Sequence, residues 1–226
     1  MSNKQTTPDI QEQADEQLNK GVQYVQNNGK KIGIAVLVVL LLVAAFLAYR
    51  NLYSIPHQKA GDAAIYQAER YFAMDSFQLA LDGNGADVVG FLDIIKEYGS
   101  TRAGNLAQAY AGICYYHLGN TESAIKHLEK FSAKDIMVAP AIYGLIGDCY
   151  VDAGQIEKGI SYFEDAAKRA DNDLLSPIFL QKAGLAYQKL GQKEKALEAF
   201  KTIKDKYYAS PLATEVDKNI EELSLN

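Results

Sequence analysis

The sequence contains no tryptophan and only two cysteines among its 226 residues. Two cysteines cannot build a disulfide framework, and these two do not form a Cys-x-x-Cys pair. Basic side chains are also in the minority, because 23 Lys and Arg face 28 Asp and Glu and leave a net charge of −5. A protein that binds nucleic acid normally has a basic face, so this balance argues against a nucleic-acid partner.

Motifs of enzymes are absent as well. The sequence has no phosphate-binding glycine loop, no Gly-x-Ser-x-Gly and no His-Glu-x-x-His. Cys114 and His117 would share one helical face, with His127 on a paired helix, but a fourth metal ligand is not evident. We therefore predict that the protein is not an enzyme and has no cofactor, metal site or small-molecule substrate.

One apolar run stands out near the N-terminus. Residues 32–49 are 18 successive residues without a charge, Asn, Gln or Pro. As a helix the run is roughly 27 Å long, close to the hydrocarbon thickness of a bilayer. A buried core helix seldom runs this far without a polar residue, and a signal peptide would not follow 31 residues that include four acids. The sequence therefore predicts a transmembrane helix over residues 32–49.

The charges beside this helix predict its orientation. Lys20, Lys30 and Lys31 precede the apolar run, whereas Arg50 and Lys59 follow it over a similar length. Cytoplasmic flanks carry an excess of Lys and Arg, so this small difference favours an N-terminus in the cytoplasm. Everything after Arg50 would then lie outside, which means the periplasm in a two-membrane bacterium.

The N-terminal segment, residues 1–31, has a thin apolar pattern of its own. Residues 1–7 are polar, and from Pro8 onward apolar residues recur every three or four positions. This pattern predicts a short amphipathic helix, which either lies on the membrane or a partner helix, or is a solvated helix before the anchor. Asn27, Asn28 and Gly29 then interrupt this apolar pattern before the span. The apolar positions are Ile10, Ala14, Leu18, Val22 and Val25.

The rest of the chain contains an internal repeat. A glycine, a tyrosine three residues later and a second glycine seven residues later occur together at Gly112, Gly147 and Gly184, which are 35 and 37 residues apart. A small residue and then a large apolar one follow at fixed offsets in each copy. The members of the three sets are Gly112, Tyr115, Gly119, Ala124 and Leu128; Gly147, Tyr150, Gly154, Gly159 and Phe163; and Gly184, Tyr187, Gly191, Ala196 and Phe200.

Each set is typical of a helical hairpin. The first glycine lets a partner helix approach closely, and the second ends the helix in a left-handed conformation. The tyrosine is expected to fill the gap between neighbouring hairpins, and the large apolar residue to fill the interior. Cys114 and Cys149 occupy equivalent positions and are expected to be buried, unpaired thiols, because neighbouring helices are about 8–10 Å apart.

These offsets resemble the tetratricopeptide repeat from about Arg102 to Tyr208. The resemblance implies an all-α solenoid. We expect a linker over 50–60, in which Pro56 disfavours helix for Ile55, and a solenoid over 61–226 that starts with a degenerate hairpin. Its first helix would run through Leu81, and its second from Val88 to Tyr98. The solenoid segments are 61–98 for the degenerate hairpin, 102–131, 138–170 and 176–207 for the repeats, and 210–224 for a capping helix that begins at Pro211.

The repeat register also predicts a concave, partner-binding groove along the first helix of each hairpin. Its first part is unusually apolar for a surface, which is typical of a contact site, although the upstream hairpin could equally cover it. The predicted groove residues are Leu106, Ala109, Ile113, Tyr116, His117, Asp148, Val151, Asp152, Ile178, Gln181, Leu185 and Gln188.

The layout of the whole chain resembles the YfgM-type ancillary subunit of the bacterial Sec translocon. A short segment, one membrane span after Asn28-Gly29-Lys30, and repeats that end in Asn219-Ile220-Glu221-Glu222-Leu223-Ser224 carry this resemblance. It implies a protein anchored in the inner membrane, with periplasmic repeats. The implied partners are translocon subunits, a membrane-anchored prolyl isomerase and nascent secreted chains. The alternative is a structural adaptor of another envelope assembly, for outer-membrane assembly or cell-wall division.

Overall fold

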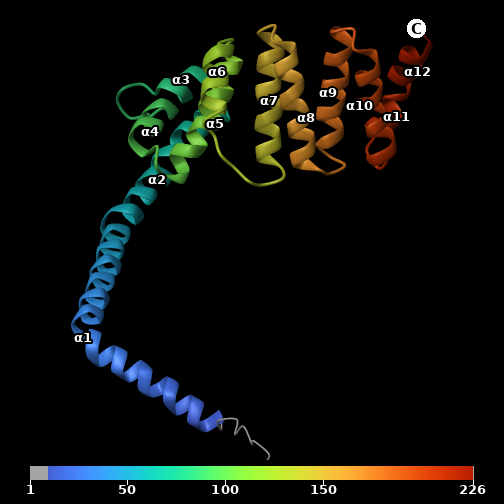
Figure 1. The fold of residues 1–226 in the computed structure, drawn as a ribbon. Helices are drawn as coiled ribbons and strands as arrows, with labels where there is room; N and C mark the ends of the chain where they lie inside the picture. The colour runs from blue at the N-terminus through green and yellow to red at the C-terminus, as the bar shows by residue number, and fades with distance from the viewer. Residues whose placement is uncertain (1–9, 226) are drawn as a thin grey trace, which may run out of the picture. The chain divides into compact units, whose positions relative to one another are not determined.

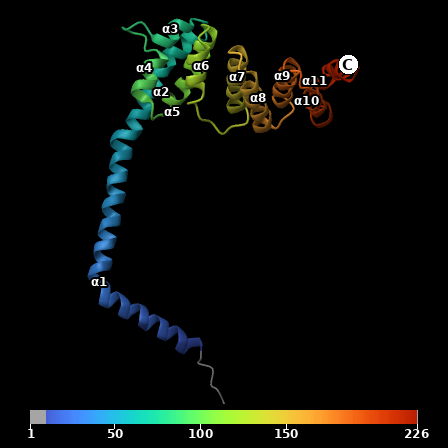
Figure 2. The same cartoon turned by 45° about the horizontal axis from the view of Figure 1, so that its top comes forward.

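The computed structural model of the chain describes residues 10–225, and every regular element in that range is helical. The chain divides into an N-terminal unit, Met1–Pro56, and a C-terminal unit, His57–Asn226. Figures 1 and 2 show the succession of helices in each unit.

The N-terminal unit is a single helical stretch, α1 (Ile10–Tyr49) followed by the π-helix η1 (Arg50–Ser54). The apolar run lies in the second half of α1, where nearly all its side chains are exposed. The helix that contains it is long and apolar enough to cross a membrane. The residues that interrupt the apolar pattern, Asn27–Gly29, do not end the helix. The helix continues there, and the Asn28 side chain donates to the Tyr24 carbonyl at 3.1 Å without interrupting it.

Pro56 also fails to end the helix, because α2 (Ile55–Phe72) follows η1 directly. The expected non-helical linker over residues 50–60 is therefore helical. Within η1 the turn is wider than in an α-helix, and the Ile55 N–H bonds to the Arg50 carbonyl five residues earlier. A wide turn leaves room for a proline ring that would otherwise clash with the carbonyl four residues before it.

The upstream region is three helices rather than a hairpin. The expected first helix is interrupted at residues 73–76, so α2 ends at Phe72 and α3 (Phe77–Asp82) follows. Asp75 has a φ of 56°, a left-handed conformation that aspartate tolerates better than most residues and that cannot continue a helix. The second helix, α4 (Phe91–Tyr98), begins three residues later than expected. In the loop before α4, the Asn84 side chain accepts hydrogen bonds from the backbone N–H groups of residues 86–88 and so stabilises the loop.

The three repeats form successive helical pairs, which Figures 1 and 2 show side by side. The expected capping helix is divided at Val216 into α11 and α12. The helices are α5 (Arg102–His117) and α6 (Thr121–Leu128); α7 (Val138–Asp152) and α8 (Ile156–Ala170); α9 (Ser176–Lys189) and α10 (Lys193–Lys206); and α11 (Leu212–Glu215) and α12 (Asp217–Leu225).

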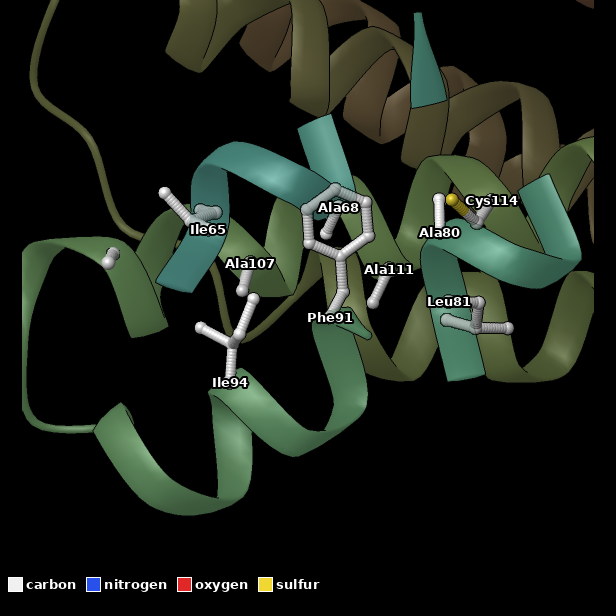
Figure 3. Close-up of a cluster of buried hydrophobic side chains, with 10 residues drawn as sticks. Ile65, Ala68, Ala80, Leu81, Phe91, Ile94, Ala107, Ala111 and Cys114 are labelled. Atoms are coloured by element: carbon white, nitrogen blue, oxygen red, sulfur yellow. The ribbon is translucent and has the colours of Figure 1, made fainter. Parts of the chain in front are cut away.

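The core of the C-terminal unit is a row of clusters rather than one centre. Figure 3 shows the first, in which Phe91 of α4 lies among side chains of α2, α3 and α5. The second joins α5, α6 and α7, the next α8 and α9, and the last α10 with the capping helices. Such a row is expected of a solenoid, in which each repeat packs only against its neighbours.

The first glycine of each repeat has the close approach that the sequence predicts. A Cβ atom added to Gly112 would lie 2.5 Å from Leu128, and one added to Gly147 or Gly184 would lie 2.6 Å from Phe163 or Phe200. These partners are the large apolar residues of the same repeats. The glycines are therefore required so that the second helix of each hairpin can bring its largest side chain onto the first.

The second glycine of each repeat has a positive φ, as predicted: 76° at Gly119, 76° at Gly154 and 69° at Gly191. Nothing lies within 4 Å of a Cβ atom at Gly154, so a side chain there would meet backbone strain but no steric clash. We expect Gly154→Val to lower the free energy of unfolding by more than about 1 kcal/mol. Urea unfolding followed by circular dichroism measures the change.

The matched control for this prediction is Ala153→Val, one residue earlier. Ala153 is also exposed but has a φ of −76°, so its replacement should cost about 0.5 kcal/mol or less. Equal losses at the two positions would show that the left-handed turn at Gly154 is not what the substitution disturbs.

Candidate protein-binding cleft

A cleft of about 240 Å³ lies between the first helices of the second and third repeats. We call it the α7–α9 cleft. Its buried floor is Phe163 of α8, and its apolar walls are Val151 of α7 and Leu185 and Ala186 of α9. Leu185 is 49% exposed, which is high for a leucine beside a cleft in a folded domain. Its remaining lining residues are Asp148, Lys182 and Lys189.

An ion pair crosses this cleft from one repeat to the next. The Lys182 Nζ atom donates to Asp148 Oδ2 at 2.6 Å, and it also lies 5.7 Å from the centre of the Phe163 ring. The two side chains are 38% and 27% exposed, so the pair is only partly shielded from water. Ion pairs with this exposure contribute little to stability, so its main effect here is to place both charges at the mouth of an apolar cleft.

Three predicted groove residues, Asp148, Val151 and Leu185, line the α7–α9 cleft together. Sequence reasoning did not select Lys182, Phe163 or Ala186. Lys182 directly follows the predicted Gln181, and its opposite charge to Asp148 is the signal that could have identified it. Phe163 was assigned to the interior, and it is indeed 2% exposed, but it also forms the floor of the cleft.

The first-repeat groove residues are partly covered. Ala109 is only 4% exposed, so it belongs to the core and does not line a groove. Leu106 is half-buried against the first core cluster. The His117 ring stacks on Phe77 of α3, with ring centres 4.2 Å apart and an angle of 2°. Helices upstream of the repeats thus contact two of these residues, as the alternative interpretation of this stripe expects.

Ile113 and Tyr116 face the second repeat instead, and both pack against the second core cluster. Burial, and then the carboxylates of Asp152 and Asp148, raises the pKa of the Tyr116 hydroxyl above its ordinary value. The structure therefore brings predicted residues of α5 and α7 together on one face. The predicted residues on α9 outside the cleft are Ile178, which is exposed, and Gln181 and Gln188, which are half-buried.

The two cysteines are buried and unpaired, as the sequence predicts. Burial raises the pKa of Cys114 and of Cys149 to about 12, so both thiols stay protonated at neutral pH. Within residues 10–225, no group of three or more His, Cys, Asp or Glu side chains is arranged to hold a metal ion.

Comparison with family models identifies the repeats. Residues 106–135 and 180–207 match one tetratricopeptide-repeat model, and residues 140–173 match another. A TPR repeat-containing protein of Methanocaldococcus jannaschii, MJ1428, is 31% identical over 113 residues, which are 50% of this chain. The chain spans only 19% of the length of that relative.

Solved structures agree on the fold. One is a crystal structure of nearly identical TPR-like repeats from a Podosopora anserina protein named as a kinesin light chain. It aligns with a TM-score of 0.56 and 14% identity, over 74% of this chain and 86% of that one. A crystal structure of MamA aligns with a TM-score of 0.50 and 20% identity, over 73% of this chain and 86% of that one. Residues 106–207 of this chain therefore form three tetratricopeptide repeats of an all-α solenoid.

Proposed function

We propose that the chain is a membrane-anchored protein-interaction module, and that the α7–α9 cleft binds a segment of its partner. The observation that supports this most is the open apolar cleft with Lys182 and Asp148 at its mouth, in a type of repeat that acts as a scaffold for protein interactions. The apolar α1 helix would hold the module at the membrane.

The lining of the cleft indicates what kind of segment would fit. Val151, Leu185 and the floor residue Phe163 offer an apolar surface large enough for one or two aliphatic side chains. Lys182 and Asp148 offer a donor and an acceptor for the backbone of the bound segment, whether it is extended or helical. Binding would be modest in affinity, because the site is small and partly open to water.

For the cellular role, we propose association with the Sec translocon and periplasmic chaperones during the handling of translocated chains. The layout resemblance supports this proposal, and the excess of lysines before the span supports a cytoplasmic N-terminus with periplasmic repeats. An adaptor of another envelope assembly would use the same cleft but a fixed set of subunits.

The experiment that tests the cleft is chemical cross-linking of the full chain in its membrane, followed by purification in mild detergent and mass spectrometry. Leu185→Asp places a charge between the apolar walls, so we expect recovery of the bound partner to fall about tenfold or more. Leu174→Asp is the matched control, since Leu174 is 62% exposed in the loop before α9 and lies outside the cleft lining.

The identity of the recovered proteins separates the two cellular roles. Translocon subunits and many different secreted chains would support the first, and a constant set of other envelope proteins would support the adaptor. If Leu185→Asp recovers the same proteins in the same amounts as the unaltered chain, the α7–α9 cleft is not the binding site.

A further inference from the structure

The repeats share an aromatic stack between their two helices, and the third repeat lacks half of it. In the first repeat Tyr115 stacks on His127, with ring centres 5.3 Å apart and an angle of 26°. In the second, Tyr150 stacks on Tyr162 at 5.4 Å and 22°. The same offsets place Ala199 opposite Tyr187 in the third repeat. The ring of Tyr187 therefore lacks the partner that both other repeats supply.

A glutamate of the preceding repeat, seventeen residues after its first glycine, accepts hydrogen bonds from the tyrosine hydroxyl groups. Glu129 Oε1 accepts hydrogen bonds from the hydroxyl groups of both Tyr150 and Tyr162, each at 2.9 Å. Glu164, the equivalent residue, accepts Tyr187 at 2.6 Å, and Ala199 has no hydroxyl with which to make the second bond. Burial, and then Glu164, raises the pKa of Tyr187 to about 12, so its hydroxyl remains a donor. The carboxylate keeps room for one more donor.

An open pocket lies beside Ala199, the residue that stands where the second repeat has Tyr162. It has a volume of about 300 Å³, and Leu180, Ala183 and Ala199 form its apolar part next to Tyr187. In the second repeat the corresponding cleft is bounded by Tyr162, and Tyr150 does not line it. The remaining lining residues of the pocket, which we call the Tyr187 pocket, are Glu164, Lys195, Glu198 and Thr202.

We propose that the Tyr187 pocket binds a tyrosine side chain of a partner protein, which takes the place that Tyr162 occupies in the second repeat. Its ring would stack on Tyr187, and its hydroxyl would donate to Glu164. Lys195 lies 5.4 Å from the centre of the Tyr187 ring, as Lys158 lies 5.1 Å from that of Tyr150, so the surroundings of the two stacks correspond.

The other ring types fit this pocket less well. The His127 ring of the first repeat bonds through Nδ1 to Gln108 at 2.8 Å, and the residue equivalent to Gln108 here is the apolar Leu180. A bound histidine would therefore lose that partner. A phenylalanine would stack but would leave the acceptor capacity of Glu164 unused. Of these three rings, the phenol is the one that matches both the apolar wall and the carboxylate.

This site is separate from the α7–α9 cleft. Tyr187 and the cleft residue Leu185 are two positions apart on α9, and residues at that spacing point to different sides of a helix. The inference depends on the proposed function only in that the ligand is a protein. Failure of binding at one site leaves the other untouched.

N-acetyl-tyrosine amide is the probe that tests the pocket. The full chain in lipid nanodiscs, labelled at its alanine and isoleucine methyl groups, is titrated while NMR follows Ala183 and Ala199. We expect saturable shifts at both methyls. N-acetyl-phenylalanine amide lacks the hydroxyl and should bind roughly tenfold more weakly. Tyr162→Ala is the positive control, because it should open an equivalent site detected at Ile146.

Two further variants make the test specific. Ala199→Tyr should fill the pocket and abolish the probe-induced shift at Ala183. Glu164→Ala alters an exposed residue, so the domain should stay folded, and it should reduce tyrosine-amide affinity to that of the phenylalanine amide. The proposal is overturned if the probe leaves Ala183 and Ala199 unshifted, or if the two amides bind the unaltered chain equally well.

Discussion

Replacing Phe200 with alanine is expected to lower the free energy of unfolding by about 3–5 kcal/mol. Phe200 is fully buried in the cluster that joins α10 to the capping helices. Its ring also lies against Gly184, where no side chain could move in to fill the space. The loss should appear as a lower urea midpoint by circular dichroism and by tyrosine fluorescence.

The control for this prediction is Tyr208→Ala, eight residues later. Tyr208 is 79% exposed, so its removal should change the free energy of unfolding by about 0.5 kcal/mol or less. A small effect of Phe200→Ala would mean that the third repeat does not depend on the helix crossing described above, and would contradict the packing of α9 on α10.

Removing residues 1–56 is expected to move the protein from the membrane fraction to the soluble fraction while leaving it strongly helical. The apolar side chains of residues 32–49 lie exposed on α1, and bringing them out of water stabilises a membrane-bound state by about 25 cal/mol per Å² of apolar surface. The C-terminal unit begins at His57 and contains the four core clusters. Fractionation after a carbonate wash and far-UV circular dichroism measure both results.

A shorter deletion provides the control for this experiment. A chain without residues 1–31 keeps the whole apolar run and should remain in the membrane fraction. If it too becomes soluble, the anchor includes the N-terminal segment. If the longer deletion yields an insoluble or strand-rich product, the C-terminal unit does not fold without the rest of the chain.

The repeats could be predicted from the sequence because their determinants are local. Gly147, Gly154 and Phe163 act through one helical hairpin, and the same offsets occur in three copies. Close approach of two helices and a positive φ each require glycine, and few other positions in the chain do, so these two glycines are recognisable in the sequence. Their positions in the structure match those predictions.

The errors concern features that depend on neighbouring geometry. Pro56 is tolerated because η1 widens the helix before it. No motif in residues 50–54 predicts a π turn, so the sequence did not indicate this. Asp75 ends α2 through a left-handed conformation that glycine more often supplies. The Asp148–Lys182 pair joins residues 34 positions apart, so it becomes visible only when two repeats are packed together.

The Tyr187 pocket is a different case. The sequence contains the information that identifies it, but only a comparison of the three repeats reveals it. Ala199 is an ordinary small residue in a helix. Its meaning comes from His127 and Tyr162 at the equivalent positions, together with the stacked geometry that those two rings adopt. Comparing the repeats with one another, position by position, identifies the departure.

The double role of Phe163 has a consequence for how the α7–α9 cleft would bind. Its ring is held between Gly147 and the interior of the second repeat, so the floor of the cleft cannot shift without disturbing the hairpin. A floor fixed in this way is pre-organised, and a ligand loses less entropy to rearrangement when it enters. Ligand binding would in turn raise the melting temperature of the second repeat, because only the folded hairpin presents that ring.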